Sequence, residues 1–253
     1  MRTAVVTPYF QESRAWLERC LDSVRRQTAA CDHIVVADGH PQDWLDGAGV
    51  RHLRLDRAHA DYGNTPRSIG AQLAISEGYD AVAFLDADNW YESDHIALCL
   101  ETAEASGADF VAAHRWWVRE DGSHLPYRAD EDRSGRHVDT SCFFLLFGAF
   151  HAVARWLLMP KPMAVVGDRA FLASLHADGL RGTMTPRPTV NYLCTWRNIY
   201  EEIGETPPAT AKDLVVTGLR QWADRLLPED LLTVRRLAGC DLQTLLSPSA
   251  PRG

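Results

Sequence analysis

The chain has 253 residues, of which 46% are hydrophobic and 24% charged, a composition typical of a folded globular protein and unlike that of a disordered one. Its 26 Lys and Arg against 34 Asp and Glu give a net charge of −8. This balance argues against a basic groove for nucleic acid and against a polybasic membrane-binding patch, but it leaves room for a small cationic pocket for one anionic ligand.

The cysteines and the apolar runs give expectations about the cellular compartment. Six Cys are spread along the chain without a C-x-x-C pair, which favours free thiols in a reducing cytoplasm over a metal or disulfide framework. The first apolar run is broken at Pro8, so we expect a buried strand there rather than a signal peptide. The longest later run, from Cys142 to Phe150, is too short to cross a membrane. The sequence therefore predicts a soluble, cytoplasmic protein without a transmembrane segment.

Short apolar runs alternate with helical patterns over residues 1–115. The predicted strands are Ala4–Thr7, Ile34–Ala37, Val50–Leu55, Ala81–Leu85 and Ala108–Ala113, and the predicted helices are Arg14–Gln27, about Pro66–Gly78, and Asp94–Ser106. This alternation is typical of an α/β fold, a mostly parallel sheet flanked by helices on both faces. Ligands of such sheets bind beyond the carboxyl ends of the strands, which places Thr7, Asp38 and Asp86–Asn89 at the predicted site.

The pattern changes after residue 115. Residues 119–136 are polar and predict a long flexible loop. The elements predicted beyond it are β-type at Val138–Phe147 and Thr189–Thr195 and helical at Phe150–Leu158, Asp168–Ala177, Ala211–Leu227 and Pro228–Leu237. We therefore expect an α/β half over residues 1–115, a second half of the same domain over 116–210, and a C-terminal helical extension over 211–253.

Asp86-Ala87-Asp88 is the sharpest chemical feature of the sequence. Two carboxylates one residue apart, directly after an apolar strand, are costly unless they are neutralised. A divalent ion is the usual solution, because Mg²⁺ and Mn²⁺ prefer oxygen ligands and often share their coordination shell with substrate phosphates. A solvated turn is the alternative, since Asp and Asn favour turns.

Three motifs resemble those of glycosyltransferase family 2. The stretch GNTPRSIGAQLAISEGYDAVAFLDADNWYESD, residues 63–94, is similar to the family's G…R-x-x-G…LDADD…P-D segment. The opening VVTPYF at residues 5–10 and IVVADG at residues 34–39 resemble the family's first segment and its I-V-V-D-D-G motif. The resemblance implies the GT-A fold, with residues 1–115 as the nucleotide-sugar-binding half and 116–210 as the acceptor-binding and catalytic half.

The resemblance also implies roles for single residues of the first half. Asp88 would bind Mn²⁺ or Mg²⁺ at the diphosphate of the donor, and Asp86 would contact the ribose or a water on that metal. Thr7 and Asp38 would hold the base and the ribose. Arg67, the arginine of R-x-x-G, would lie near the base and the diphosphate.

In the second half, Asp168 is the predicted catalytic residue. It stands in VVGDRAF, residues 165–171, which resembles the family's E-D-x-x-(F/L) segment, and it would be the general base that takes the proton of the acceptor hydroxyl. The expected reaction is a metal-dependent, non-processive and inverting transfer of a sugar from a nucleotide-diphosphate sugar. The acceptor would be a hydroxyl of a glycan, a lipid-linked molecule or a small molecule.

Departures from the family pattern at Ala37 and Gly167 keep alternatives open. The resemblance to the family implies UDP as the donor nucleotide, but Ala37 replaces the first acid of I-V-V-D-D-G and leaves GDP and dTDP open. Gly167 replaces the glutamate before the proposed base. One alternative function is a sugar-phosphate nucleotidyltransferase, although no glycine-rich basic loop follows the first strand. The other is a degenerate, non-catalytic nucleotide-sugar-binding module.

Three further groups of residues have both a functional and a structural interpretation. Asp139-Thr140-Ser141 would lie on the acceptor side of the cleft or at a polar strand entrance. Trp116 and Trp117 would form a sugar-stacking platform or belong to the core. The last group, which would close over the diphosphate or lie in a solvated loop, comprises His124, Tyr127, Arg128 and His137.

Overall fold

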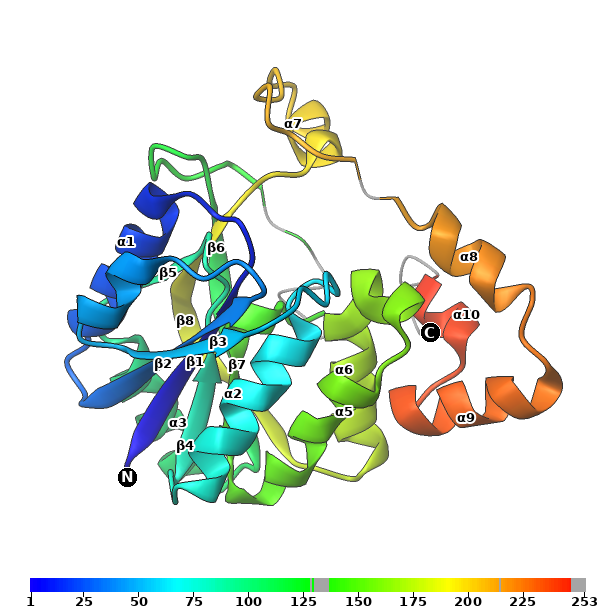
Figure 1. The fold of residues 1–253 in the computed structure, drawn as a ribbon, viewed down its shortest axis with the longest axis horizontal. Helices are drawn as coiled ribbons and strands as arrows, with labels where there is room; N and C mark the ends of the chain where they lie inside the picture. Colours follow the sequence, from blue (N-terminus) through cyan, green and yellow to red (C-terminus); the bar gives the residue numbers. More distant parts are fainter. Residues whose placement is uncertain (128, 130–136, 214, 247–253) are drawn as a thin grey trace.

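The structure, a computed structural model, describes residues 1–127, 129, 137–213 and 215–246. Its centre is an eight-stranded sheet with the order β3-β2-β1-β4-β7-β6-β8-β5 (Figure 1). The strands are β1 Thr3–Tyr9, β2 Cys31–Asp38, β3 Arg51–Leu55, β4 Ala81–Phe84, β5 Trp90–Tyr91, β6 Phe110–Val118, β7 Phe143–Leu146 and β8 Gly182–Leu193. Of these, β5 and β7 run opposite to the other six. The mostly parallel α/β sheet of the prediction is confirmed.

Helices flank this sheet on both faces (Figure 1). The α-helices are α1 Arg14–Arg25, α2 Asn64–Ser76, α3 His95–Ser106, α5 Ala154–Leu158, α6 Gly167–Ala177, α7 Arg197–Glu202, α8 Thr217–Ala223, α9 Pro228–Ala238 and α10 Leu242–Leu246. Four 3₁₀ turns lie at Asp43–Gly47, Thr140–Cys142, Phe147–Val153 and Lys161–Val166. None of the described helices is long and apolar enough to cross a membrane.

The alternation of side chains along β2 places α1 and α2 on opposite faces of the sheet. Val35 packs in one cluster with Leu17 of α1, whereas Val36 packs in the main core on the face of α2. On α2, a Cβ at Gly70 would lie 2.6 Å from Cγ1 of Val6 and 3.0 Å from Cγ2 of Val36. Only glycine therefore lets α2 lie this close to β1 and β2. This close packing fixes the start of α2, and with it Arg67, at the carboxyl ends of the strands.

One prediction at β1 is wrong, because the strand continues through Pro8 to Tyr9. Pro8 lies opposite Val36 of β2. On the other side of β1, pairing with β4 ends at Val6 and Phe84. Since β4 offers no partner at the level of Pro8, the missing N–H of proline leaves no ladder hydrogen bond unmade.

Two elements predicted after residue 115 are too long, one in the second half and one in the C-terminal extension. The β-type stretch Val138–Phe147 contains a 3₁₀ turn before β7, because the Asp139 side chain accepts a hydrogen bond from Ser141 N and caps that turn. The predicted helix Ala211–Leu227 is reduced to α8, since Lys212 N donates to the carbonyl of Thr195 and holds this segment in a bridge to Trp196. Residues 128 and 130–136 of the predicted loop lie outside the described residues.

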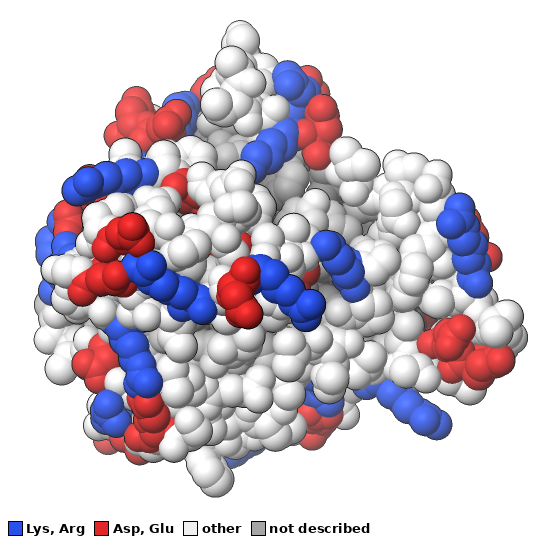
Figure 2. Space-filling model, in the orientation of Figure 1, with Lys and Arg blue, Asp and Glu red and all other residues white. Residues whose placement is uncertain are grey.

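The helices α8, α9 and α10 lie together beside α6, on the side of the molecule away from β2 and β3 (Figure 1). They share a small hydrophobic cluster with α6 and the turn before it, made of Met163, Val166, Ala170, Leu219, Val234, Ala238, Leu242 and Leu245. The C-terminal helices are thus packed onto the second half through apolar side chains. On the face drawn in Figure 2, acidic and basic side chains are interspersed along the surface.

Candidate active site

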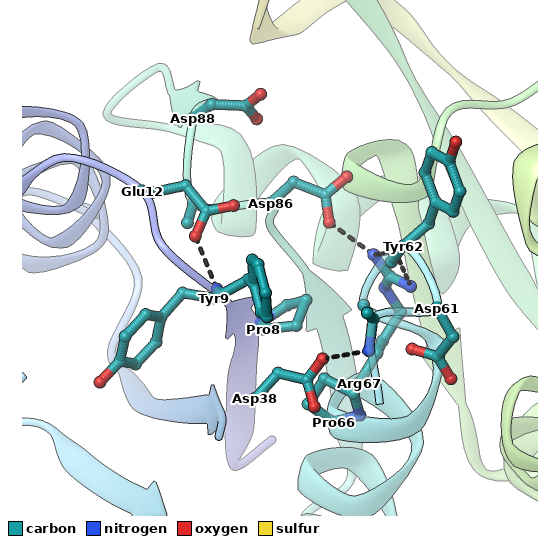
Figure 3. A pocket seen from close by; sticks show the side chains of 14 residues that line it. Pro8, Tyr9, Glu12, Asp38, Asp61, Tyr62, Pro66, Arg67, Asp86 and Asp88 are labelled. Atoms are coloured by element: carbon teal, nitrogen blue, oxygen red, sulfur yellow. Dashed lines mark hydrogen bonds and ion pairs between the residues drawn. The ribbon is translucent and has the colours of Figure 1, made fainter. Parts of the chain in front are cut away.

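A pocket of about 340 Å³ opens at the carboxyl ends of β1, β2 and β4, the edge at which the sequence predicted ligand binding. Four of the predicted site residues line it together, namely Asp38, Arg67, Asp86 and Asp88 (Figure 3). The sequence assigned no individual role to the other lining residues, which are Pro8, Tyr9, Phe10, Glu12, Ala60, Asp61, Tyr62, Gly63, Pro66 and Ala87. Most of these come from the segments that follow β1 and precede α2, where no charge pattern marks them in the sequence.

Arg67 forms a buried ion pair with Asp86. Its guanidinium, only 2% exposed, donates from Nη2 to Asp86 Oδ1 at 2.6 Å. It also donates from Nη1 to Asn64 Oδ1 at 3.2 Å and lies 5.0 Å from the ring centre of Trp156. Because these contacts fix the guanidinium, Asp86 is held in one orientation and its charge is neutralised by a rigid cation.

Asp88 is in a different electrostatic situation. No described residue hydrogen-bonds or forms an ion pair with its half-buried carboxylate. Burial, together with the nearby carboxylates of Asp86, Glu12 and Asp139, raises the pKa of Asp88 to about 7, against a smaller opposing effect of Lys212. Negative charge therefore accumulates at this point of the pocket, and Lys212 offsets only part of it.

This arrangement fits an oxygen-liganded divalent cation. Asp88 and the Asp86 oxygen that does not bind Arg67 are carboxylate ligands of the kind that Mg²⁺ and Mn²⁺ prefer. Among the described residues, no group of three or more His, Cys, Asp or Glu could hold a metal on its own. A cation here would thus complete its coordination shell with water or with a bound ligand.

A second layer of hydrogen bonds holds the Asp86–Asn89 turn. The Ser141 hydroxyl oxygen accepts from Asp86 N at 3.1 Å and from Asn89 Nδ2 at 2.8 Å, while Asn89 Oδ1 accepts from Leu193 N at 2.9 Å. Asp139 Oδ1 in turn accepts from Ser141 N at 3.0 Å. Of Asp139-Thr140-Ser141, the structure thus shows two residues supporting the acidic turn, a role that the sequence did not suggest.

Asp38 lines the pocket, but its carboxylate is used to hold the loop before α2. It accepts from His59 N at 2.8 Å, from His59 Nδ1 at 2.9 Å and from Ala60 N at 2.9 Å. Ala60 and Tyr62 have positive φ angles of 49° and 57°. Such backbone conformations persist only where the surroundings impose them, and Asp38 is one of those restraints on the pocket wall.

Thr7 is not brought to the pocket. Its side chain is fully buried, and its hydroxyl lies 2.8 Å from His33 Nε2. Burial lowers the pKa of His33 to about 3. The His33 ring is therefore neutral and forms a hydrogen bond with the Thr7 hydroxyl. The side chain of Thr7 thus serves the packing of β1 against β2 in this structure.

Asp168 lies at the start of α6, outside the pocket lining. Its Oδ2 is 2.7 Å from His137 Nε2, and its Oδ1 accepts from Arg169 N at 2.7 Å. Burial acts to raise the pKa of Asp168, but its contact with His137 and the hydrogen bond from Arg169 N outweigh this effect and hold the pKa below its usual range. Burial raises the pKa of Asp139, and the carboxylates of Asp86 and Asp168 add to this effect against the opposing charge of Arg115.

The remaining candidates that the structure describes do not line this pocket. Trp117 is buried and packs edge to face on Tyr127, 5.0 Å between ring centres, so it belongs to the core. Trp116 is half-buried and stacks on His124 at 4.7 Å. The rings of Trp116 and His124 line a second pocket, together with Leu125, Pro126, Tyr127, Glu202 and Ile203. Arg128 lies outside the described residues.

Solved structures of S. aureus TarS are among those with a similar fold. The structure of S. aureus TarS 1–349 in complex with UDP-GlcNAc matches with a TM-score of 0.60 at 14% identity, over 94% of this chain and 65% of that chain. TarS 1–349 in complex with UDP matches with a TM-score of 0.57 at 13% identity, over 80% and 63%. The longer TarS structure matches at 0.58 and 12%, over 80% and 38%. This chain therefore spans less than two thirds of the length of these proteins, and the likeness shows the shared fold.

No curated protein sequence matches the chain. The family described as Glycosyl transferase family 2 matches residues 4–174. That range contains β1 to β7, the Asp86-Ala87-Asp88 turn, and Asp168 at the start of α6. The resemblance seen in the motifs is thereby confirmed over most of the chain, and the protein belongs to glycosyl transferase family 2.

Proposed function

We propose that the protein transfers a sugar from a nucleotide-diphosphate sugar to an acceptor hydroxyl, in a metal-dependent, non-processive reaction. One observation carries this proposal: Arg67 holds Asp86, and Asp88 lies beside it in the same pocket without a partner among the described residues. A rigid cation and a carboxylate with no ion-pair partner among the described residues suit a ligand that brings both a diphosphate and a divalent ion.

The pocket is the proposed donor site. Asp38, Arg67, Asp86 and Asp88 would surround the nucleotide-diphosphate sugar, with Asp88 and Asp86 holding Mn²⁺ or Mg²⁺. When bound, such an ion would stabilise the negative charge of the leaving nucleoside diphosphate. The similar structures in complex with UDP and UDP-GlcNAc support UDP as the nucleotide to test first. Thr7 is left out of the proposed site, because its hydroxyl is buried against His33.

Asp168 is the proposed general base. It would accept the proton of the acceptor hydroxyl as the acceptor oxygen forms its bond to the anomeric carbon and the bond to the diphosphate oxygen breaks. The low pKa of Asp168 keeps it ionised at neutral pH, as a base must be. Attack from the face opposite the leaving nucleotide would invert the anomeric centre.

The same assignment divides the chain into functional parts. Residues 1–115 would bind the donor, since all the pocket residues belong to them. Residues 116–210 would supply Asp168 and the acceptor side, and residues 211–253 a helical extension packed on α6. We expect the acceptor on the side of α6, because the base must reach its hydroxyl.

Release of UDP from UDP-GlcNAc, with water as the acceptor, tests the proposal without a known acceptor. We expect slow release that needs Mn²⁺ and is lost in Asp88→Asn. The matched control is Asp80→Asn, the same change just before β4, at the opposite edge of the sheet. Binding of UDP without any release would favour the non-catalytic binding module. Pyrophosphate release from UTP and a sugar phosphate would instead indicate the nucleotidyltransferase.

A further inference from the structure

A continuous set of side-chain contacts joins Asp168 to the turn that carries Asp86. Asp168 Oδ2 contacts His137 Nε2 at 2.7 Å, and His137 Nδ1 lies 3.5 Å from Arg115 Nη2. Arg115 Nη1 forms an ion pair with Asp139 Oδ2 at 3.1 Å. Asp139 then reaches the acidic turn through Ser141. The proposed base and the proposed metal ligands are therefore held by one connected framework.

Arg115 is the fixed point of this framework. Its side chain is only 3% exposed, and the guanidinium carbon lies 4.2 Å from the ring centre of Trp117 and 4.4 Å from that of Tyr192. The two aromatic rings and the ion pair to Asp139 restrict it to a single orientation. The Arg115 guanidinium is thus held in a fixed position next to His137.

The chemistry of Arg115 determines which nitrogen of His137 carries the proton. A guanidinium only donates hydrogen bonds, so a proton on His137 Nδ1 would point at a donor and be repelled. Nδ1 must therefore accept, and the proton of the neutral ring must lie on Nε2. From Nε2 the imidazole N–H donates to Asp168 Oδ2. A second proton on the ring would lie on Nδ1 and would again place a donor against the Arg115 guanidinium.

We infer that His137 is a positioning residue for Asp168, held by Arg115 as the Nε2–H tautomer so that it orients the base carboxylate and keeps it ionised. This inference rests on the proposed function, in which Asp168 takes the proton of the acceptor. His137 does not itself remove that proton, because both of its ring nitrogens are engaged by Arg115 and Asp168. Asp168 Oδ2 still has a lone pair for the incoming proton.

The charged and titratable groups that face Asp168 determine the expected pH dependence. His137 and Arg169 favour its ionised form, and Asp139 lies close enough for its charge to oppose it. Loss of the His137 donor would raise the pKa of Asp168. Since the base must be ionised to act, the acidic limb of the kcat profile would then move to higher pH.

Long-range ¹H–¹⁵N NMR of the ¹⁵N-histidine-labelled full chain tests the tautomer directly. The His137 signals are identified by their loss in His137→Gln. We expect a protonated Nε2 and an unprotonated Nδ1 at pH 7.5. A protonated Nδ1, in either the other neutral tautomer or the imidazolium, would overturn the inference. This measurement does not depend on whether the protein turns over a substrate.

The pH profile of UDP release from UDP-GlcNAc, measured with Mn²⁺, tests the effect on the base. We expect His137→Phe to lower kcat by about 100-fold and to shift the acidic limb upward, whereas His137→Gln, whose amide still donates, recovers most of the rate. The matched control is His151→Phe, which removes a similar histidine from Asp178 at the other end of α6. Unchanged kcat and limb in His137→Phe would overturn the inference. If the wild-type protein released no UDP, the proposed function would be contradicted. The NMR measurement of the His137 tautomer needs no turnover, and Asp168→Asn tests the base itself. A failure of the proposed function is therefore distinguishable from a failure of the role of His137.

Discussion

Arg67 binds Asp86 at 2.6 Å from within the core, whereas Asp88, two residues further along the same turn, has no such partner among the described residues. The two carboxylates of the acidic motif are therefore not equivalent. Asp86 is fixed and neutralised, and Asp88 has its pKa raised to about 7 by burial and by neighbouring carboxylates. Asp88 is the carboxylate that gains most from a bound cation.

Replacing Arg67 tests the weight of this ion pair. In Arg67→Met, Asp86 and Asn64 lose a buried cation, and we expect the free energy of unfolding to fall by about 3 kcal/mol. Urea unfolding measures it. The control is Arg187→Met, which breaks a surface pair with Asp94 and should cost less than about 0.5 kcal/mol. If both variants lost the same free energy of unfolding, burial of the ion pair between Arg67 and Asp86 would contribute nothing to stability.

Asp88 makes the stability of the metal-free protein depend on pH. Its pKa is higher in the folded chain than in the unfolded chain, so the folded state binds more protons and stability falls as pH rises from about 4 to about 7. Asp88→Asn removes this loss. We expect the variant to be more stable than the wild type at pH 8 by about 1–2 kcal/mol, allowing for solvent screening, and similar to it at pH 4.

Chemical denaturation of both proteins in the presence of a chelator measures this difference. Added Mn²⁺ should stabilise the wild type at pH 8 more than at pH 5, and should leave Asp88→Asn almost unaffected. If the free energies of unfolding of the two proteins changed with pH in parallel between pH 4 and pH 8, the raised pKa of Asp88 in the folded chain would be contradicted.

Gly39 tests the loop that Asp38 holds. Its φ is +76°, and a Cβ there would collide with the backbone of Ala58, next to the pocket wall. The matched control is Gly49→Ala, because Gly49 has a φ of +70° with nothing close to an added Cβ. We expect Gly49→Ala to cost about 1–2 kcal/mol from the backbone conformation alone. Gly39→Ala should cost clearly more in urea unfolding and should weaken UDP binding, and equal costs would mean that the loop can move aside.

Asp168→Asn separates catalysis from donor binding. The variant retains an oxygen that can accept from His137 but cannot take up a proton, so we expect UDP release from UDP-GlcNAc to fall by about 10²–10⁴-fold. Affinity for UDP should be unchanged, because Asp168 lies outside the pocket lining. The control is Asp178→Asn at the other end of α6, which should alter stability and not turnover. Turnover near the wild-type rate in Asp168→Asn would remove Asp168 as the base.

The sequence was enough to predict the elements in which apolar side chains follow one regular pattern along the chain. The apolar runs that became β1, β2 and β4 lie in the buried part of the sheet, and the motif glycine Gly70 marks a close helix packing that depends on few residues. The first part of β8 was missed because Pro186 and Pro188 argue against a strand. Both are tolerated, since β5 pairs with β8 only at Val190 and Asn191 and the register with β6 shifts near Pro188.

The site was predictable only where one segment carries the chemistry. Asp86 and Asp88 are separated by one residue and follow an apolar strand, so local sequence was enough to single them out. The framework of Arg115, Asp139 and His137 joins residues from separate segments, and no local pattern marks the contact of His137 with Asp168. The same limit applies to Thr7, whose position after a strand suggested a site, whereas its hydroxyl is directed to His33.

The central claim is that Asp88 holds a divalent cation together with the diphosphate of the donor. Calorimetric titration of UDP into the wild type and Asp88→Asn, each with Mn²⁺ and with a chelator, tests it most directly. We expect Mn²⁺ to strengthen UDP binding to the wild type by about tenfold or more and to leave binding to Asp88→Asn unchanged. An equal gain from Mn²⁺ in both proteins would contradict the account.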